Sequence, residues 1–401
     1  MAFKLTKKTW AIIALVIIII AIGAGYYYYT QITKPPGIIK IGVVMNLTGP
    51  WASIDEPCWK GIQLAIDEIN AKGGILGREV KAICIDTKAD EAEVVAAVRR
   101  LIEMEKVCII IGYCDTHWVL TAAPVAKELG VPFITPGATH PRIPERSGAW
   151  LACFGDNAQA AAVAEYAIKE LGLKKVAVWI DTACDFSVAV CTYFKDAWEH
   201  YGGTVVYEDY FETEWTDYSE LVARLKSYQD RGEIDCVYIG AIPGNVGLII
   251  KQIREGGVTV QILGEDGFDT PLLVEVAGEY AEGTIFATHV SLESPDPKVQ
   301  KFVSAYKKKW GVKPENAFAA LGYDAMMIVA KAIELAGSDD PKAIESALGK
   351  VTYDGVTGSV SYSPGVKVPA KSVAVLKVEG GKFKTITMLT PKYMPPPELA
   401  P

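Results

Sequence analysis

Polar and small residues follow several short apolar runs of this sequence, where they could bind a small molecule. The loop at 112–118 reads Gly-Tyr-Cys-Asp-Thr-His-Trp, and another loop contains Gly137, Ala138 and Thr139. A hydroxyl residue at the start of a helix caps it, and the free N–H groups behind the cap attract an anion. The Thr116 hydroxyl is therefore expected either to bind a ligand carboxylate or only to cap its helix.

A carboxylate in a third loop could bind a positive group. Asp266 lies in the run Gly-Glu-Asp-Gly at 264–267, and its partly desolvated pairing with a ligand ammonium would be stronger than a pairing at the surface. The alternative is a solvated turn, which an acidic pair before glycine commonly forms. Trp51, Trp118 and Phe186 lie in or beside the same loops and could form apolar pocket walls or belong to the core.

The elements that position these loops alternate between strands and helices. The expected strands are 38–45, 80–85, 107–112, 132–134, 175–180, 204–210, 236–240 and 261–264, and the expected helices are 59–71, 91–106, 116–129, 158–171, 186–201, 218–229, 244–256, 297–310 and 317–336. This alternation predicts an α/β fold with doubly wound parallel sheets, arranged as two Rossmann-like lobes in series. In such sheets a ligand binds beyond the carboxyl ends of the strands, where the loops above lie.

The first 37 residues are expected to form a membrane anchor and tether. Lys4, Lys7 and Lys8 precede an apolar run from Trp10 to Tyr29, which is about long enough to span a bilayer with its basic end in the cytoplasm. No convincing cleavage site precedes the tyrosines, so an uncleaved signal anchor is favoured over a cleaved signal. The body then lies on the outer face of the cytoplasmic membrane, or is secreted if the segment is cleaved.

Composition limits the partners of the chain. Its 40 Lys and Arg against 48 Asp and Glu give a net charge of −8, which argues against nucleic acid and favours a small molecule. The four scattered His and the spacing of the eight Cys do not fit a metal site, so we expect no cofactor. Outside the cytoplasm at least one disulfide is expected, and Cys58 and Cys114 are the candidates.

An enzyme is the main alternative to a binding protein. No G-x-G-x-x-G follows the first strand, and the sequence contains neither G-x-S-x-G nor H-E-x-x-H, so we expect no catalytic residues. A membrane sensor is a second alternative. Only nine residues precede the apolar run, too few for a cytoplasmic signalling domain of ordinary size.

Several longer runs resemble a known family. IKIGVVMNLTGP at 39–50 and GIQLAIDEINAKGGILGREV at 61–80 are similar to the opening of the type I periplasmic binding proteins of ABC importers, in the Leu/Ile/Val-binding branch. FITPGATHP at 133–141, YSELVARLKS at 218–227 and AEGTIFATHV at 281–290 extend the resemblance over about residues 38–390. It implies an extracytoplasmic receptor, expected to be a monomer, whose two lobes close on a small amino acid and deliver it to an ABC permease.

The resemblance also implies roles for individual residues. Thr116 and Thr139, with the backbone of Ala138, would hold the ligand carboxylate, Asp266 its ammonium, and Phe186 would contact its side chain. The remaining expected ligand-binding residues are Asp115, Gly137, Trp51 and Trp118.

The expected pocket departs from the family at two positions. Ile54 and Ile242 stand where an aromatic residue is common. An amide, a urea or an aromatic carboxylate therefore remains an alternative ligand.

The resemblance gives expected boundaries for each part of the chain. After the anchor and tether at 1–37, the first lobe comprises 38–155 and 290–359, the second comprises 156–289 and 360–390, and 391–401 forms a disordered tail. The three-strand hinge between the lobes is expected near 154–155, 288–289 and 358–361.

Overall fold

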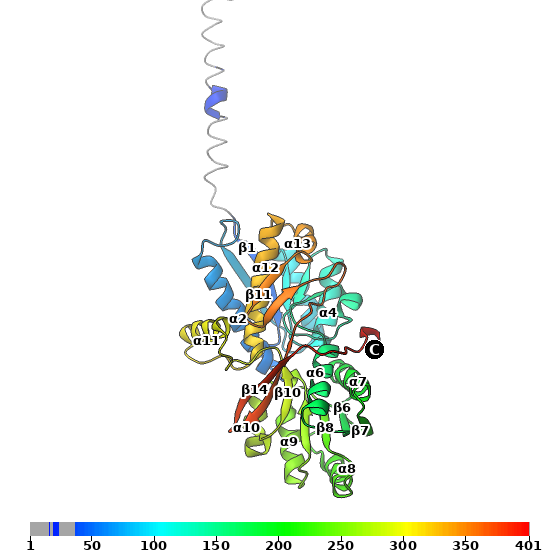
Figure 1. Ribbon diagram of the computed structural model, residues 1–401. Coiled ribbons are helices and arrows are strands. Elements are labelled where there is room, and N and C mark those ends of the chain that lie inside the picture. The colour runs from blue at the N-terminus through cyan, green and yellow to red at the C-terminus, as the bar shows by residue number, and fades with distance from the viewer. Residues whose placement is uncertain (1–15, 17–18, 24–36, 401) are drawn as a thin grey trace, which may run out of the picture.

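The computed structural model describes residues 16, 19–23 and 37–400 (Figure 1). The predicted membrane anchor falls mainly outside these residues. Among the residues that are described, no helix is both long enough and apolar enough to cross a membrane.

The first lobe contains a five-stranded sheet in the order β2-β1-β3-β4-β5, in which every neighbouring pair is parallel. Its strands are β1 (Ile39–Met45), β2 (Val80–Asp86), β3 (Ile110–Gly112), β4 (Phe133–Thr135) and β5 (Trp150–Leu151). The lobe also contains α2 (Ala52–Ala71), α3 (Glu91–Arg99), α4 (Thr116–Glu128), α5 (Ile143–Ser147), α11 (Pro297–Trp310), α12 (Ala317–Ala336), α13 (Pro341–Leu348) and the hairpin of β11 (Thr352–Gly355) and β12 (Gly358–Ser361).

The second lobe contains a seven-stranded sheet in the order β14-β13-β10-β9-β8-β6-β7, with β13 and β14 antiparallel to their neighbours. Its strands are β6 (Lys175–Asp181), β7 (Thr204–Phe211), β8 (Cys236–Gly240), β9 (Gln261–Gly264), β10 (Ile285–Thr288), β13 (Val373–Glu379) and β14 (Lys382–Leu389). Its helices are α6 (Asp156–Lys169), α7 (Asp185–His200), α8 (Ser219–Asp230), α9 (Val246–Glu255) and α10 (Pro271–Ala277).

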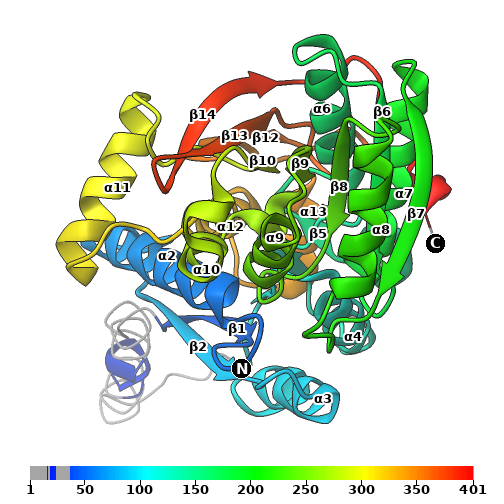
Figure 2. The same cartoon turned by 90° about the horizontal axis from the view of Figure 1, so that it is seen from below.

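Helices cover both faces of the second sheet (Figure 2). Strand β6 explains this arrangement, because its side chains alternate between the faces. Val176 and Val178 pack with residues of α6 and α7, whereas Ala177 and Trp179 pack with residues of α8 and α9. The predicted doubly wound α/β fold with two lobes is confirmed.

Helix α2 begins at Ala52, earlier than the predicted start at 59. Pro57 lies inside its first turns, where the missing N–H leaves the carbonyl of Ser53 without a helical partner. The side-chain amide of Asn316 donates to that carbonyl at 2.8 Å. A contact from the start of α12 therefore allows α2 to continue through the proline.

The polypeptide passes between the lobes three times, and the crossing segments contact one another. The ring of Phe154 in the first segment stacks on His289 in the second at 4.0 Å between centroids. Lys371 Nζ in the third segment donates to the carbonyl of Ala152 in the first at 3.1 Å. The third crossing lies later than the expected 358–361, because β12 pairs with β11 and Lys367 still pairs with Leu151 in the first lobe.

The C-terminal tail differs from the disordered segment that was expected. The side chain of Asn157 donates to the carbonyl of Pro395 at 2.9 Å, and the hydroxyl of Tyr193 donates to that of Pro397 at 2.6 Å. Ala400 is buried against the second lobe. The prediction of disorder was wrong for 391–400, because buried polar groups of α6 and α7 find their partners in this segment.

Candidate functional site

A small cavity lies between the two lobes, at the carboxyl ends of their strands. Its volume is about 20 Å³. The first lobe contributes Ile54, Cys114, Asp115, Gly137, Thr139 and Phe318, and the second contributes Phe186, Ile242, Pro243, Asp266 and Gly267. Seven separate loops or helix starts thus meet there, as expected for a ligand site in an α/β protein.

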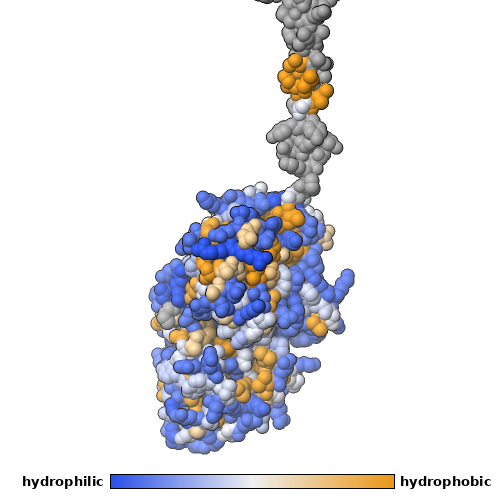
Figure 3. Space-filling view, turned by 180° about the vertical axis from the view of Figure 1, so that it is seen from behind, coloured by the Kyte–Doolittle hydropathy of each residue, from blue (hydrophilic) through white to orange (hydrophobic). Residues whose placement is uncertain are grey.

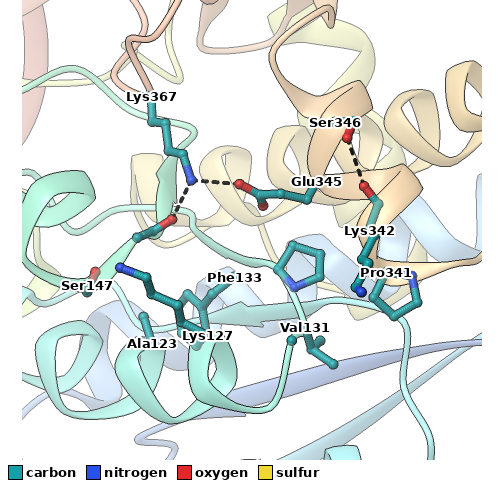
Figure 4. Close-up of a pocket in the computed structure, with 13 residues that line it drawn as sticks. Ala123, Lys127, Val131, Phe133, Ser147, Pro341, Lys342, Glu345, Ser346 and Lys367 are labelled. Atoms are coloured by element: carbon teal, nitrogen blue, oxygen red, sulfur yellow. Dashed lines mark hydrogen bonds and ion pairs between the residues drawn. The ribbon is translucent and has the colours of Figure 1, made fainter.

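A larger cavity, of about 380 Å³, lies elsewhere on the first lobe (Figure 4). It is lined by residues of α4, α5 and α13 and by Val131 and Phe133 at the amino end of β4. Lys367 Nζ there donates to the carbonyl of Gly148 and to Glu345, both at 2.7 Å. We favour the smaller cavity as the candidate site because it lies at the carboxyl ends of strands from both lobes.

The lobes are close together around the smaller cavity. Helix α4 of the first lobe contacts α7 of the second, and a Cβ placed on Gly244 would lie 3.9 Å from the carbonyl oxygen of Pro50. A volume of about 20 Å³ is enough for about one water molecule. A ligand as large as an amino acid would therefore fit only if the lobes or their side chains moved apart.

Asp266 lies on the second-lobe wall, in a short 3₁₀ turn that follows β9. Its carboxylate accepts from Gln159 Nε2 at 2.9 Å and pairs with His289 Nε2 at 2.8 Å, while its backbone N–H donates to Gln159 Oε1 at 3.0 Å. Burial lowers the pKa of His289 despite its bond to Asp266, so the imidazole is neutral at pH 7. These bonds fix the carboxylate at the cavity without a buried cation to neutralise it.

Asp115, rather than the expected Thr116, caps helix α4. Its carboxylate accepts from the backbone N–H of His117 at 3.0 Å and also lies on the cavity wall. Thr116 is the first residue of the helix, is buried, and is not among the cavity-lining residues. Its hydroxyl has no hydrogen-bond partner within the described chain. The anion-attracting helix start is therefore occupied by a carboxylate of the protein itself.

The loop after β4 contributes Gly137 and Thr139 to the cavity but not Ala138. The N–H of Ala138 donates to Thr135 Oγ1 at 2.9 Å, and its carbonyl accepts from Cys153 Sγ at 3.2 Å. Gly137 allows close packing, because a Cβ there would lie 3.0 Å from the ring of Phe318. The backbone groups of Ala138 are thus already used inside the protein.

Aromatic rings form part of the wall, but not all of those predicted. Phe186 lines the cavity, as does Phe318 of α12. Trp51 and Trp118 are absent from its lining and pack edge to face on each other, with centroids 5.5 Å apart. The two tryptophans therefore pack against each other and do not form the cavity wall.

The cavity is acidic. Asp115 and Asp266 are its charged residues, and no Lys, Arg or His is among the lining residues described above. Burial raises the pKa of Asp115 to about 6. Behind the wall, Asp55 accepts from the N–H groups of Asn46 and Cys114 at 2.8 and 3.0 Å, and burial raises its pKa to about 7.

The expected disulfide between Cys58 and Cys114 is not formed, and all eight cysteines are free thiols. Both residues are buried and their thiols contact each other. Burial raises the pKa of each thiol, which disfavours the thiolate needed for bridge formation. Within the described chain, no group of three His, Cys, Asp or Glu residues is arranged to hold a metal ion.

Sequence reasoning missed several residues of the site. Phe318 lies in an apolar helix whose pattern indicates only a core role. Gln159 and His289 orient Asp266 from α6 and from a hinge segment, and these contacts depend on the arrangement of the hinge. Only its position in the sequence, next to the lining residue Ile54, could have indicated that Asp55 belongs to the site.

Comparisons with known proteins agree with this geometry. Residues 38–382 match the family model described as periplasmic binding protein. The Leu/Ile/Val-binding protein homolog 3 of Brucella melitensis is 30% identical over 352 residues, which cover 86% of this chain and 92% of that protein.

Two crystal structures extend the similarity. The leucine-binding protein LivK of Thermotoga maritima has a TM-score of 0.81 and 35% identity, covering 88% of this chain and 99% of that chain. The branched-chain amino acid binding protein LivJ of Streptococcus pneumoniae, in complex with isoleucine, has a TM-score of 0.82 and 28% identity, covering 88% of this chain and all of that chain.

Proposed function

Because this chain belongs to the periplasmic binding protein family, we propose that it is the extracytoplasmic solute receptor of an ABC importer. It binds a small amino acid, branched-chain or similar, between two closing lobes and delivers it to the permease. The names of its relatives support this ligand class, because they include proteins for leucine, isoleucine and valine.

The observation that carries the proposal is the buried carboxylate of Asp266 on the cavity wall. Its hydrogen bonds to Gln159 and His289 orient it without supplying a buried positive charge. A ligand ammonium would supply that charge, and a desolvated charge-assisted bond of this kind is strong. Ile54, Phe186 and Ile242 would surround the apolar part of the ligand.

We infer that the chain acts as a binding protein and not as an enzyme, because its sequence lacks the catalytic motifs sought above. The basic and apolar residues at 1–37 support an anchor that holds the receptor at the outer face of the membrane. We expect the body to be a monomer. On the face in Figure 3 the apolar side chains form several separate groups among polar ones.

Thermal unfolding of the full chain in mild detergent tests this function against a panel of amino acids, amides, urea and benzoates. A true ligand at one hundred times its Kd adds about 2.7 kcal/mol to the stability. The Asp266→Asn variant should lose this gain, whereas Asp185→Asn, at an exposed acid on α7 of the same lobe, should keep it. Stabilisation by no panel member would contradict the proposal.

A further inference from the structure

The larger cavity of the first lobe is rimmed by lysines (Figure 4) and has no role in the proposed function. The volume of this lysine-rimmed cavity, about 380 Å³, is within the range of small-molecule pockets. The buried side chains of Val131 and Phe133 line it together with three lysines, Lys127, Lys342 and Lys367. Apolar and cationic groups side by side fit a ligand that has an apolar part and a negative charge.

Two of the lysines lie against the same residue of the cavity wall, Gly148. Lys367 Nζ donates to the carbonyl of Gly148 and to Glu345, both at 2.7 Å. A Cβ placed on Gly148 would lie 2.9 Å from Lys127 Cδ and 3.6 Å from Lys127 Nζ. Two ammonium groups thus lie beside one residue, and Glu345 neutralises only one of them. An anion bound here would offset the remaining charge.

The acids next to the cavity along the chain have partners of their own. Asp339 and Glu128 each pair with an arginine, at 2.7 and 3.5 Å, and the Asp340 carboxylate accepts an N–H at the start of α13 at 3.0 Å. In the described part of the chain, Lys127 and Lys342 form no ion pair. The cavity therefore keeps a positive charge, although the whole chain has a net charge of −8.

The cavity lies at the end of the first lobe where the chain enters from the expected anchor. An adjoining cavity of about 430 Å³ shares Val131 and Pro341 with it and is also lined by Ile38 and Lys40. Strand β1 begins at the same end of the lobe as α13 (Figure 1). The eight residues at 30–37 can span at most about 29 Å. An anchor in the bilayer would therefore hold this end of the lobe close to the membrane surface.

Exposed aliphatic side chains lie at the same end of the lobe. They precede β1, β2 and β3 or lie in the last turn of α12, and they are 44 to 74% exposed: Ile38, Leu76, Met104 and Leu335. Lysines next to exposed apolar side chains are typical of surfaces that lie on a membrane. This end of the first lobe thus has the composition of a membrane-contact surface.

We propose that the lysine-rimmed cavity binds the phosphate headgroup of an anionic phospholipid and holds this end of the first lobe against the membrane. Lys127 and Lys367 contact the phosphate, and Val131 and Phe133 contact the apolar part of the lipid next to it. The inference rests on the anchor of the proposed function, which brings the cavity to the lipid. The cleft lies at the opposite, carboxyl ends of the strands, so this contact leaves it open to its own ligand.

Hydrogen–deuterium exchange of the full chain tests the proposal in two kinds of vesicle. One contains phosphatidylglycerol mixed with phosphatidylcholine, and the other contains phosphatidylcholine alone. The anchor is the same in both, so a difference in exchange reports on the lipid charge. We expect the backbone amides in 127–133 and 342–346 to exchange about fivefold more slowly with phosphatidylglycerol. Equal exchange in the two vesicles would overturn the inference.

Variants and a free anion identify the site and the source of the phosphate. Lys127→Gln and Lys342→Gln each remove one charge at an exposed position, and each should reduce the protection by phosphatidylglycerol severalfold. Lys308→Gln, at an exposed lysine on α11 of the same lobe, should keep it. An equal loss in all three variants would show general attraction to the membrane instead of a site. Inorganic phosphate in mild detergent should not protect these amides, and protection by phosphate alone would exclude the lipid as the specific ligand.

The amino-acid panel separates a failure of this inference from a failure of the proposed function. Lys127→Gln should keep the thermal stabilisation by the best panel compound, because the cleft does not include this residue. Intact stabilisation without lipid protection would refute the lipid site and leave the receptor function standing. Lipid protection without stabilisation by any panel compound would refute the amino-acid function and support the lipid site.

Discussion

At the residue scale, Asp266 is oriented before any ligand arrives, because Gln159 and His289 hold both of its carboxylate oxygens. Asp266→Asn keeps the shape and removes the charge. A buried ammonium would then lack its partner, and we expect a loss of about 2 to 5 kcal/mol in binding free energy. Calorimetry with the best ligand of the panel measures this loss. An affinity equal to that of wild type would exclude an ammonium at this position.

Thr139 and Thr116 provide a second comparison within one lobe. Thr139 lies on the cavity wall, whereas Thr116 is buried outside it. We expect Thr139→Ala to weaken binding by about 1 to 3 kcal/mol through loss of one hydrogen bond, and Thr116→Ala to leave the affinity unchanged. Titration of both variants with the same ligand checks this. A larger loss of affinity for Thr116→Ala would mean that the ligand binds the hydroxyl at the start of α4 instead.

Buried acids make the stability depend on pH. Burial raises the pKa of Asp55 to about 7 and that of Asp115 and Asp269 to about 6. The folded state thus holds protons that the unfolded chain has released, so stability falls as pH rises from about 4 to 7. We expect the ligand-free protein to be more stable at pH 5.5 than at pH 8 by about 2 to 4 kcal/mol. Denaturant unfolding at the two pH values gives the difference, and greater stability at pH 8 would contradict it.

Five of the nine predicted site residues line the cavity, namely Asp115, Gly137, Thr139, Phe186 and Asp266. They were predictable because a parallel sheet brings the loops after its strands to one edge. Thr116 was wrongly predicted to cap α4, because Asp and Thr are both good N-cap residues and the sequence does not show which of the two adjacent positions begins the helix. The partners of Asp266 were not predictable, since they come from distant segments.

At the element scale, the crossing of α2 and α12 supports the first-lobe half of the site. A Cβ on Gly322 would lie 2.0 Å from the carbonyl oxygen of Cys58, and one on Gly61 would lie 1.9 Å from that of Ala319. Gly322→Ala must therefore push the two helices apart, and we expect it to cost about 1 to 3 kcal/mol or more of stability. Gly337→Ala is not a suitable control because its φ is +63°.

A suitable control for this crossing is Ala336→Gly at the other end of α12, where the residue is half-buried. This substitution should lower the free energy of unfolding by only about 1 kcal/mol, because glycine favours a helix less than alanine does. Denaturant unfolding of the two variants decides between a tight crossing and ordinary helix packing. Equal losses in the two variants would mean that the helices can adjust to the extra methyl group.

Helices with clear capping and terminating residues were predicted with their exact bounds, whereas strands without such a signal in the sequence were missed. Helices 297–310 and 317–336 match because Asp296 and Asn316 cap their starts and Gly311 and Gly337 end them. Strands β13 and β14 were not identified. β13 pairs with β10, almost ninety residues earlier in the chain, and β14 joins the sheet only through β13. Such long-range pairing leaves no periodic signal within one short window.

At the scale of the whole molecule, binding and closure are coupled because Thr139 and Asp266, which we expect to contact the ligand, lie on different lobes. A ligand that contacts both lobes favours the closed state only to the extent that it binds the closed form more tightly than the open form. Micromolar affinity corresponds to about −8 kcal/mol, which a charge-assisted bond and the burial of an aliphatic side chain can supply. The contacts among the three hinge segments make hinge closure the expected motion.

The most direct test is a crystal structure of the chain with L-leucine, or with the panel compound that stabilises it most. The cleft between the lobes should hold the ligand, with its ammonium within hydrogen-bond distance of the Asp266 carboxylate and its side chain among Ile54, Phe186 and Ile242. A ligand found instead in the lysine-rimmed cavity of the first lobe (Figure 4), with the cleft unoccupied, would contradict the account.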